Sequence, residues 1–227
     1  MANFARDTVR TILTQGVVIG ASLLAGVLTA RVLGPDARGL FSLCLLVATT
    51  ATLFGGFELG QALVFWRGNK RTPDKALAGA ALLAPVVSTV LTLAAMALIW
   101  PLLSDTLEVL SPDLLAIAIA LIPVGMSSLA VRQLFRAFDR FDRFNALRVL
   151  NPVFRATAIG ATFLFFGSTV RDAILAVWFA EALVLVVGLV VLLRHVRPDL
   201  RGGLRAIPGL LRFGVVHSFT TTDSIDR

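Results

Sequence analysis

The chain has 227 residues, of which 57% are hydrophobic and 15% are charged, and its formal net charge is +7. One soluble domain of this length can bury a single core but not this many apolar residues, which excludes an ordinary soluble protein. The single cysteine, Cys44, excludes a disulfide framework and a cysteine-based zinc cluster.

Six long apolar stretches account for this composition. Each contains about 20 residues or more, enough for an α-helix to cross a hydrocarbon core of about 30 Å. Because backbone polar groups in lipid must be paired within their own segment, these stretches should be helical. The sequence therefore predicts an all-α, polytopic transmembrane bundle, with spans at Ile12–Leu33, Leu40–Trp66, Ala76–Leu103, Leu114–Leu134, Val149–Gly167 and Ala173–Leu193.

Lysines and arginines gather at alternate ends of these stretches. Sixteen lie in the N-terminal segment, around the links after the second and fourth stretches, and after the sixth. The other ends contain only Arg31, Arg38 and Arg171. Because basic residues are retained on the cytoplasmic side, this distribution predicts a cytoplasmic N-terminus. The positive charge is then explained by anionic membrane lipids as partners, and no nucleic acid is expected to bind.

The segment Arg132–Phe144 alternates arginines with phenylalanines. At about 100° per residue, Arg132, Arg136, Arg140 and Arg143 fall on one side of a helix and the phenylalanines on the other. This pattern predicts that the fourth span continues beyond the membrane as an amphipathic cytoplasmic helix. The four arginines are candidates for binding an anionic lipid head group or a diphosphate, or they serve only to anchor the helix at the cytoplasmic surface.

Three ionisable residues lie within the predicted spans: Glu58, Arg155 and Glu181. A charge at mid-bilayer costs at least about 2.5–3.5 kcal/mol, so such side chains usually face protein or water. Counted at the helical rise, Glu58 and Arg155 should each lie about 10–12 Å from the cytoplasmic surface. These two residues could form a structural ion pair or line a substrate cavity. Three glycines around Glu58 would also let a ligand or a neighbouring helix approach.

No catalytic or metal-binding pattern accompanies these spans. The two histidines, His195 and His217, do not have metal-ligand spacing, and neither a nucleotide-binding loop nor a nucleophile motif occurs. We therefore expect no enzyme activity, no cofactor and no metal site.

Two motifs resemble those of a known transporter family. Ala30–Gly39 matches every fixed position of the pattern A-R-x-L-G-P-x-x-R-G. This pattern is similar to the turn between helices one and two of polysaccharide (O-antigen-type) flippases, in the multidrug/oligosaccharidyl-lipid/polysaccharide exporter superfamily. Leu211–Gly214, followed by Asp223–Arg227, resembles the seventh helix of that family, with its pattern L-x-F-G … L-D-R.

The resemblance implies two six-helix lobes around a central cavity. Residues 1–207 would form the N-terminal lobe, and a seventh helix starting at Pro208 would begin a second lobe (208–227), the rest of which is missing. The protein would move a polyprenyl-diphosphate-linked oligosaccharide across the bacterial cytoplasmic (inner) membrane for surface polysaccharide synthesis. Arg31 and Arg155 are candidates for balancing the diphosphate charge, with Glu58 and Glu181 as further cavity residues. Arg31 is equally suited to a role in the turn.

Two other functions remain open at this point. A multidrug cation antiporter of the same superfamily would need membrane carboxylates for ion coupling, and the first span contains none. A structural membrane module without transport activity is the other alternative.

Overall fold

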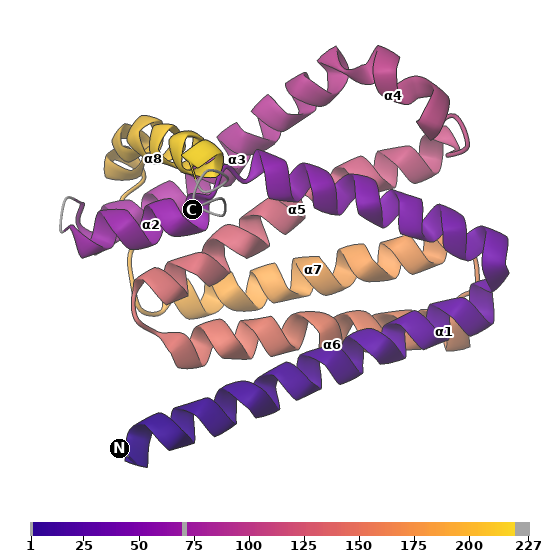
Figure 1. Cartoon of the computed structure of the whole chain (residues 1–227), viewed down its shortest axis with the longest axis horizontal. Helices are drawn as coiled ribbons and strands as arrows, with labels where there is room; N and C mark the ends of the chain where they lie inside the picture. The colour runs from indigo at the N-terminus through magenta and orange to yellow at the C-terminus, as the bar shows by residue number, and fades with distance from the viewer. Residues whose placement is uncertain (1, 70–71, 221–227) are drawn as a thin grey trace.

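The computed structural model describes residues 2–69 and 72–220, and helices make up nearly all of this part (Figure 1). The prediction of an all-α fold is confirmed. The helices are α1 (Ala2–Gly55), α2 (Leu59–Gly68), α3 (Asp74–Leu98), α4 (Trp100–Leu107), α5 (Pro112–Ala137), α6 (Phe141–Phe165), α7 (Val170–Leu193) and α8 (Leu200–Thr220).

The long helices run back and forth along the longest axis of the molecule. Figure 1 shows the N-terminus, α2, the turn between α5 and α6, and α8 at one end, on the left. The bend of α1, α4 and the link between α6 and α7 lie at the opposite end, on the right. The segments rich in basic residues therefore gather at one end of the bundle, which we call the basic end. The acidic link before α5 lies at the other end.

The bend in α1 occurs at Gly34, whose φ of 74° and ψ of 176° lie outside the helical region. Glycine adopts this backbone conformation without the strain that a side chain would cause, and the fixed φ of Pro35 suits the start of the next helical segment. α1 thus consists of a first arm, residues 2–33, and a second arm, residues 35–55, which folds back along the bundle (Figure 1). This bend lies within Ala30–Gly39, where the resemblance implied a turn between the first two helices.

Four stretches of the described chain are helical, long and apolar enough to cross a membrane: Ile12–Gly68, α3, α5 and α7. The first of them contains both arms of α1, and therefore the first two predicted spans. The fifth predicted span corresponds to α6, which is less apolar because it contains Asn151, Pro152 and Arg155. α6 packs against both α1 and α7, where protein rather than lipid can surround polar side chains.

Two predicted spans are interrupted. The second, Leu40–Trp66, is broken between α1 and α2, where Phe57 and Glu58 adopt left-handed conformations with φ of 42° and 47°. The third, Ala76–Leu103, is broken at Ile99 between α3 and α4. These spans are therefore not the continuous helices that we predicted. An apolar pattern reports contact with lipid or core, and it does not report a local break in the backbone.

The predicted continuation of the fourth span past the membrane is also wrong. α5 ends at Ala137, the chain reverses at Asp139 with a φ of 56°, and α6 begins at Phe141. Arg67 of α2 stabilises this turn, since its Nη1 atom donates hydrogen bonds of 2.7 Å to the Ala137 carbonyl oxygen and to the Asp139 carboxylate. The arginines of this segment are thus divided between two helices and do not share one helical face.

α8 begins at Leu200, earlier than the start predicted at Pro208, so the helix runs across the predicted boundary between the two lobes. Asp199 caps it by accepting hydrogen bonds of 3.1 Å from two backbone N–H groups of the first turn. The backbone N–H of Asp199 also donates to the carbonyl oxygen of Lys75, which ties the start of α8 to the start of α3. The motif residues Asp223–Arg227 lie outside the described residues.

Two buried clusters hold the bundle together. One contains Leu63, Leu134 and Leu210 and joins α2, α3, α5, α6, α7 and α8 near the basic end. The other contains Cys44 and Ile174 and joins α1, α4, α5, α6 and α7 toward the opposite end. The outer surface carries large exposed apolar side chains, as expected for helices surrounded by lipid. Examples are Ile12, Leu23, Val90, Phe166 and Phe179.

Candidate functional site

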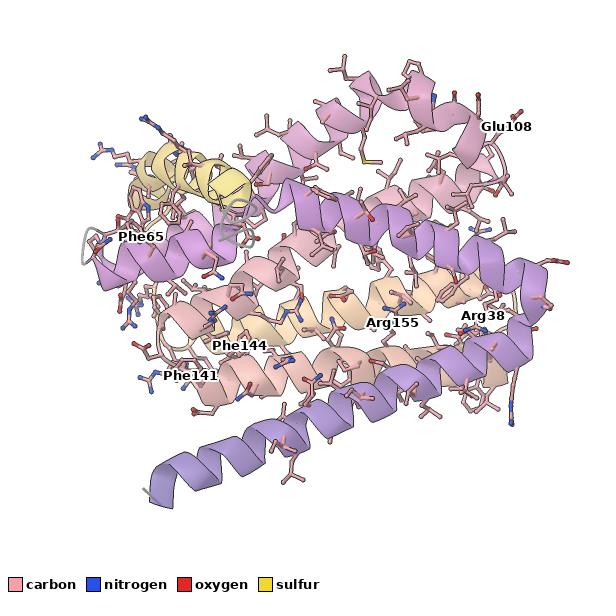
Figure 2. All side chains as sticks on the ribbon, in the orientation of Figure 1. Arg38, Phe65, Glu108, Phe141, Phe144 and Arg155 are labelled. Carbon is pink, nitrogen blue, oxygen red and sulfur yellow. The ribbon has the colours of Figure 1, made fainter. Side chains whose placement is uncertain are left out.

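One internal cavity is lined by charged side chains from three helices. Arg132 of α5, Arg155 of α6 and Glu181 of α7 line a cavity of about 260 Å³, together with Thr49 and Thr52 from the second arm of α1. All three charged residues are half-buried. Figure 2 shows Arg155 in the middle of the bundle, between the ribbons of α6 and α7. The cavity thus places charges between helices whose other contacts are mainly apolar.

Glu181 is held in place by a neutral partner. The Nδ2 atom of Asn151 donates a hydrogen bond of 2.6 Å to Oε1 of Glu181. The second carboxylate oxygen, Oε2, is buried and accepts no hydrogen bond within the described part of the chain, and Nε of Arg132 is buried without an acceptor there. Buried polar atoms are normally bonded to protein or water. Two residues that line the cavity therefore retain one unused donor and one unused acceptor.

The charges in this cavity do not cancel. The Glu181 carboxylate interacts electrostatically with the guanidinium groups of both Arg132 and Arg155. Among the side chains that the structure describes, however, the direct ion pairs are those of Arg67, and none joins Glu181 to Arg132 or Arg155. Two positive groups thus face one negative group. In a medium of low dielectric, the excess positive charge attracts an anion more strongly than it would in water.

A second cavity lies on the other side of Arg155. It has a volume of about 300 Å³ between the first arm of α1 and α6, and its lining includes Ser22, Thr29, Asn151 and Arg155. Arg155 therefore lines both hollow regions of the bundle, and Asn151 lines the second of them. A ligand in either region can reach the Arg155 guanidinium.

The sequence as a whole shows which kind of protein contains these cavities. Residues 4–221 match the family described as "Polysaccharide biosynthesis protein". The chain belongs to this family. The polysaccharide biosynthesis family is part of the MOP flippase/exporter superfamily, so the chain is a multi-pass membrane protein of a transporter family and not an enzyme. No curated protein and no solved structure matches the chain.

In this polysaccharide biosynthesis protein, Arg155 and Glu181 line the internal cavity, but Glu58 does not. Glu58 is exposed at the break between α1 and α2, and it lines a separate cavity of about 200 Å³ with Gln133 and Arg136. The ion pair that we considered between Glu58 and Arg155 is not formed, and Glu181 is the carboxylate beside Arg155. The depth estimate assumed an unbroken second helix, and the helix ends just before Glu58.

Arg31 does not line the internal cavity either. It is exposed near the bend of α1, as is Arg38 at the other end of the same motif. Figure 2 shows Arg38 at the end of the bundle where α1 bends. Of the two roles considered for Arg31, this position favours the role in the turn.

The four arginines predicted at the cytoplasmic surface have different surroundings. Arg132 lines the internal cavity, whereas Arg136 is half-buried beside the turn between α5 and α6, and Arg140 is exposed there. The Nη2 atom of Arg143 donates a hydrogen bond of 2.5 Å to Nε2 of His195, whose Nδ1 atom donates to a backbone carbonyl of α7. Three of the four residues thus remain at the basic end, and Arg132 belongs with the cavity.

Asn151, which bonds to Glu181 and lines the second cavity, is a residue that the sequence analysis missed. A signal was available, because Asn151 is an amide within an apolar stretch and precedes Arg155 by one helical turn. Residues with this spacing lie on the same face of a helix. The internal position of Arg132 was harder to predict, since it lies close to the end of its apolar stretch and resembles the basic residues that follow it.

Proposed function

We propose that this protein moves a polyprenyl-diphosphate-linked oligosaccharide across the cytoplasmic membrane of a bacterium for surface polysaccharide synthesis. The observation that carries the proposal is the excess of positive charge in the internal cavity, where Arg132 and Arg155 face Glu181. A guanidinium binds phosphate oxygens in a bidentate way, and such charge-assisted bonds are about twice as strong as neutral ones. A diphosphate would also supply the acceptor that Nε of Arg132 lacks.

Family membership supports the rest of the substrate. A polysaccharide biosynthesis protein in a flippase and exporter superfamily is expected to transport a molecule that carries sugar. A lipid-linked oligosaccharide combines such a sugar with the anionic group that the cavity chemistry favours. The lipid part would remain among the exposed apolar side chains of the bundle.

In this proposal the basic end of the bundle faces the cytoplasm, as the positive-inside rule requires. Arg136, Arg140 and Arg143 would then contact anionic lipid head groups of the inner leaflet. Residues 1–207 would form one lobe of the transporter, and α8 would lead into a second lobe. The two lobes together would alternate the access of the cavity to the two sides of the membrane.

The charges of the cavity argue against a cation antiporter. A site for a cationic drug would need more negative than positive groups, and the reverse is found at Arg132, Arg155 and Glu181. The same buried charges are costly in a purely structural membrane module, which would gain nothing from them.

Complementation tests the proposal. The gene is expressed in a strain that lacks its own flippase, and surface polysaccharide is measured for the wild type, Arg155→Ala and Glu58→Gln. We expect the wild type and Glu58→Gln to restore the polysaccharide and Arg155→Ala to lose it. If the expressed protein exports cationic dyes and restores no surface polysaccharide, the flippase proposal is wrong and the protein is a cation antiporter.

A further inference from the structure

We propose that Glu181 is a built-in competitor for the transported anion: its charge weakens the binding of a diphosphate to Arg132 and Arg155 so that the substrate can be released. This inference rests on the proposed function. It gives Glu181 a role in the release of the substrate and not in its coordination.

The Glu181 carboxylate is held near the two arginines by another residue and forms no ion pair with them. Asn151, a neutral amide on α6, donates the hydrogen bond of 2.6 Å that holds Oε1 of Glu181. Asn151 precedes Arg155 by one helical turn, so this bond keeps the carboxylate close to the Arg155 side of the cavity. Within residues 2–69 and 72–220, no ion pair joins Glu181 to either arginine. The guanidinium groups thus stay available to a ligand.

Bonding capacity is left over on both sides of the cluster. Arg132 and Glu181 line the same cavity, and Nε of Arg132 and Oε2 of Glu181 are buried without a hydrogen-bond partner in the described chain. A fully ionised diphosphate can accept a bond from Arg132, but it has no proton to donate to Oε2. When the anion enters, the uncompensated oxygen of the Glu181 carboxylate lies near a second negative charge.

Other groups around Glu181 do not change the sign of this effect. The second arm of α1 contributes the neutral Thr49 and Thr52, and α5 contributes Arg132, which also interacts with Arg148. Among the described residues that line this cavity, Glu181 is the acidic one. Any repulsion of the substrate from within the cavity must therefore come from this residue.

Repulsion between like charges a few ångströms apart in a protein interior is sufficient to lower an affinity by about ten-fold or more. A transporter needs such a limit, because a site must bind well enough to load and weakly enough to unload. Two arginines alone would hold a diphosphate tightly in a low-dielectric cavity. Glu181 sets the balance toward release.

The test measures binding of farnesyl diphosphate and farnesyl monophosphate to the full chain in lipid nanodiscs by isothermal titration calorimetry. We expect Glu181→Gln to bind the diphosphate about ten-fold more tightly than the wild type, and Glu181→Asp to retain the affinity of the wild type because it keeps the charge. The gain for Glu181→Gln should be smaller with the monophosphate, because repulsion scales with the charge of the ligand. Surface polysaccharide should appear more slowly with Glu181→Gln despite the tighter binding.

Two further variants separate this inference from the proposed function. Glu58→Gln makes the same chemical change outside the internal cavity, and its affinity for the diphosphate should equal that of the wild type. Arg155→Gln should weaken binding. If Arg155→Gln binds as the wild type does, or the wild type binds no diphosphate, the proposed function fails and the inference with it. If Arg155→Gln weakens binding but Glu181→Gln does not tighten it, the competitor role alone is refuted.

Discussion

Gly214 of α8 lies directly against the backbone of Phe57, and a Cβ atom at position 214 would overlap the Phe57 carbonyl oxygen. Phe57 and Glu58 form the left-handed break between α1 and α2. Non-glycine residues in this region carry a strain of about 1–3 kcal/mol each, which the surrounding packing must offset. Phe213, next to Gly214, stacks on Phe65 of α2 with ring centroids 4.4 Å apart. α8 thus packs against the interrupted second predicted span both at the break and along α2.

Gly214→Ala should therefore destabilise the protein by about 1–3 kcal/mol, because an added methyl group in a close-packed contact forces the backbones apart. Thermal unfolding of the purified protein in detergent would show this as a melting temperature several degrees below that of the wild type. Gly20→Ala is the matched control, since no atom lies within 4 Å of a Cβ at that position. Equal melting of Gly214→Ala and the wild type would show that α8 does not hold the break.

Gly34→Ala is expected to strain the bend of α1. The φ of 74° and ψ of 176° at Gly34 belong to a region that residues with a Cβ adopt only at a cost of about 1–3 kcal/mol. The variant should yield less folded protein in size-exclusion chromatography and should melt at a lower temperature. Gly39→Ala changes another glycine of the same motif, one with open space around it, and should behave as the wild type does. A Gly34→Ala protein with wild-type stability would contradict the bend.

The membrane helices could be predicted because lipid imposes a length and an apolar composition that the sequence displays directly. The bend at Gly34 and Pro35 could be predicted too, since these residues have strong local preferences. The glycines around Glu58 indicated a weakened helix, but the left-handed break at Phe57 and Glu58 was not predicted. Neither residue favours a left-handed backbone, and the break is held by packing against a segment far along the chain, at Gly214.

The candidate site was only partly predictable for a related reason. The cost of burying a charge in a membrane singled out Arg155 and Glu181 from the sequence alone. Which charges lie together depends on how each helix is rotated about its axis and on which helices pack against it. The depth of a residue along one helix gives neither piece of information. The sequence therefore suggested Glu58 as the partner of Arg155, whereas α7 brings Glu181 to that position. The reversal at Asp139 likewise separated Arg132 and Arg136 on α5 from Arg143 on α6.

Arg67→Ala should loosen the basic end of the bundle. Arg67 bonds to the Ala137 carbonyl and the Asp139 carboxylate at 2.7 Å and to Asp74 at 3.2 Å, and it lies 5.3 Å from the Phe138 ring centroid. Its removal leaves the end of α5 without a donor, at an expected cost of about 1–3 kcal/mol. Arg67→Lys keeps the charge but cannot fork between several acceptors, so its stability should be intermediate.

Thermal unfolding at low and at high salt measures this effect. The ionic contribution of Arg67 should shrink at high salt, because exposed charges such as those of Asp74 and Asp139 are screened. Arg140→Ala is the control, since this exposed arginine lies in the same turn. Its free energy of unfolding should differ from that of the wild type by no more than about 0.5 kcal/mol. If Arg67→Ala has the same melting temperature as Arg140→Ala and the wild type, Arg67 does not stabilise this turn.

Single cysteines can locate the two ends of the bundle relative to the membrane. Cys44 is buried, and Cys44→Ala removes the natural thiol from the background. Arg140→Cys, Glu108→Cys and Ser168→Cys each place a thiol at an exposed position. Arg140 lies just before α6 and Ser168 just after it, so this pair also reports whether the less apolar α6 crosses the membrane.

We expect a membrane-impermeant maleimide to label Glu108→Cys and Ser168→Cys in intact cells, and to label Arg140→Cys only after the membrane is made permeable. The physical reason is the concentration of arginines and lysines at the basic end, which is retained on the cytoplasmic side during insertion. Labelling of Arg140→Cys in intact cells with protection of Glu108→Cys would reverse the orientation. Equal labelling of Arg140→Cys and Ser168→Cys under both conditions would mean that α6 does not cross, and the cavity beside Arg155 would then no longer lie within a membrane-spanning bundle.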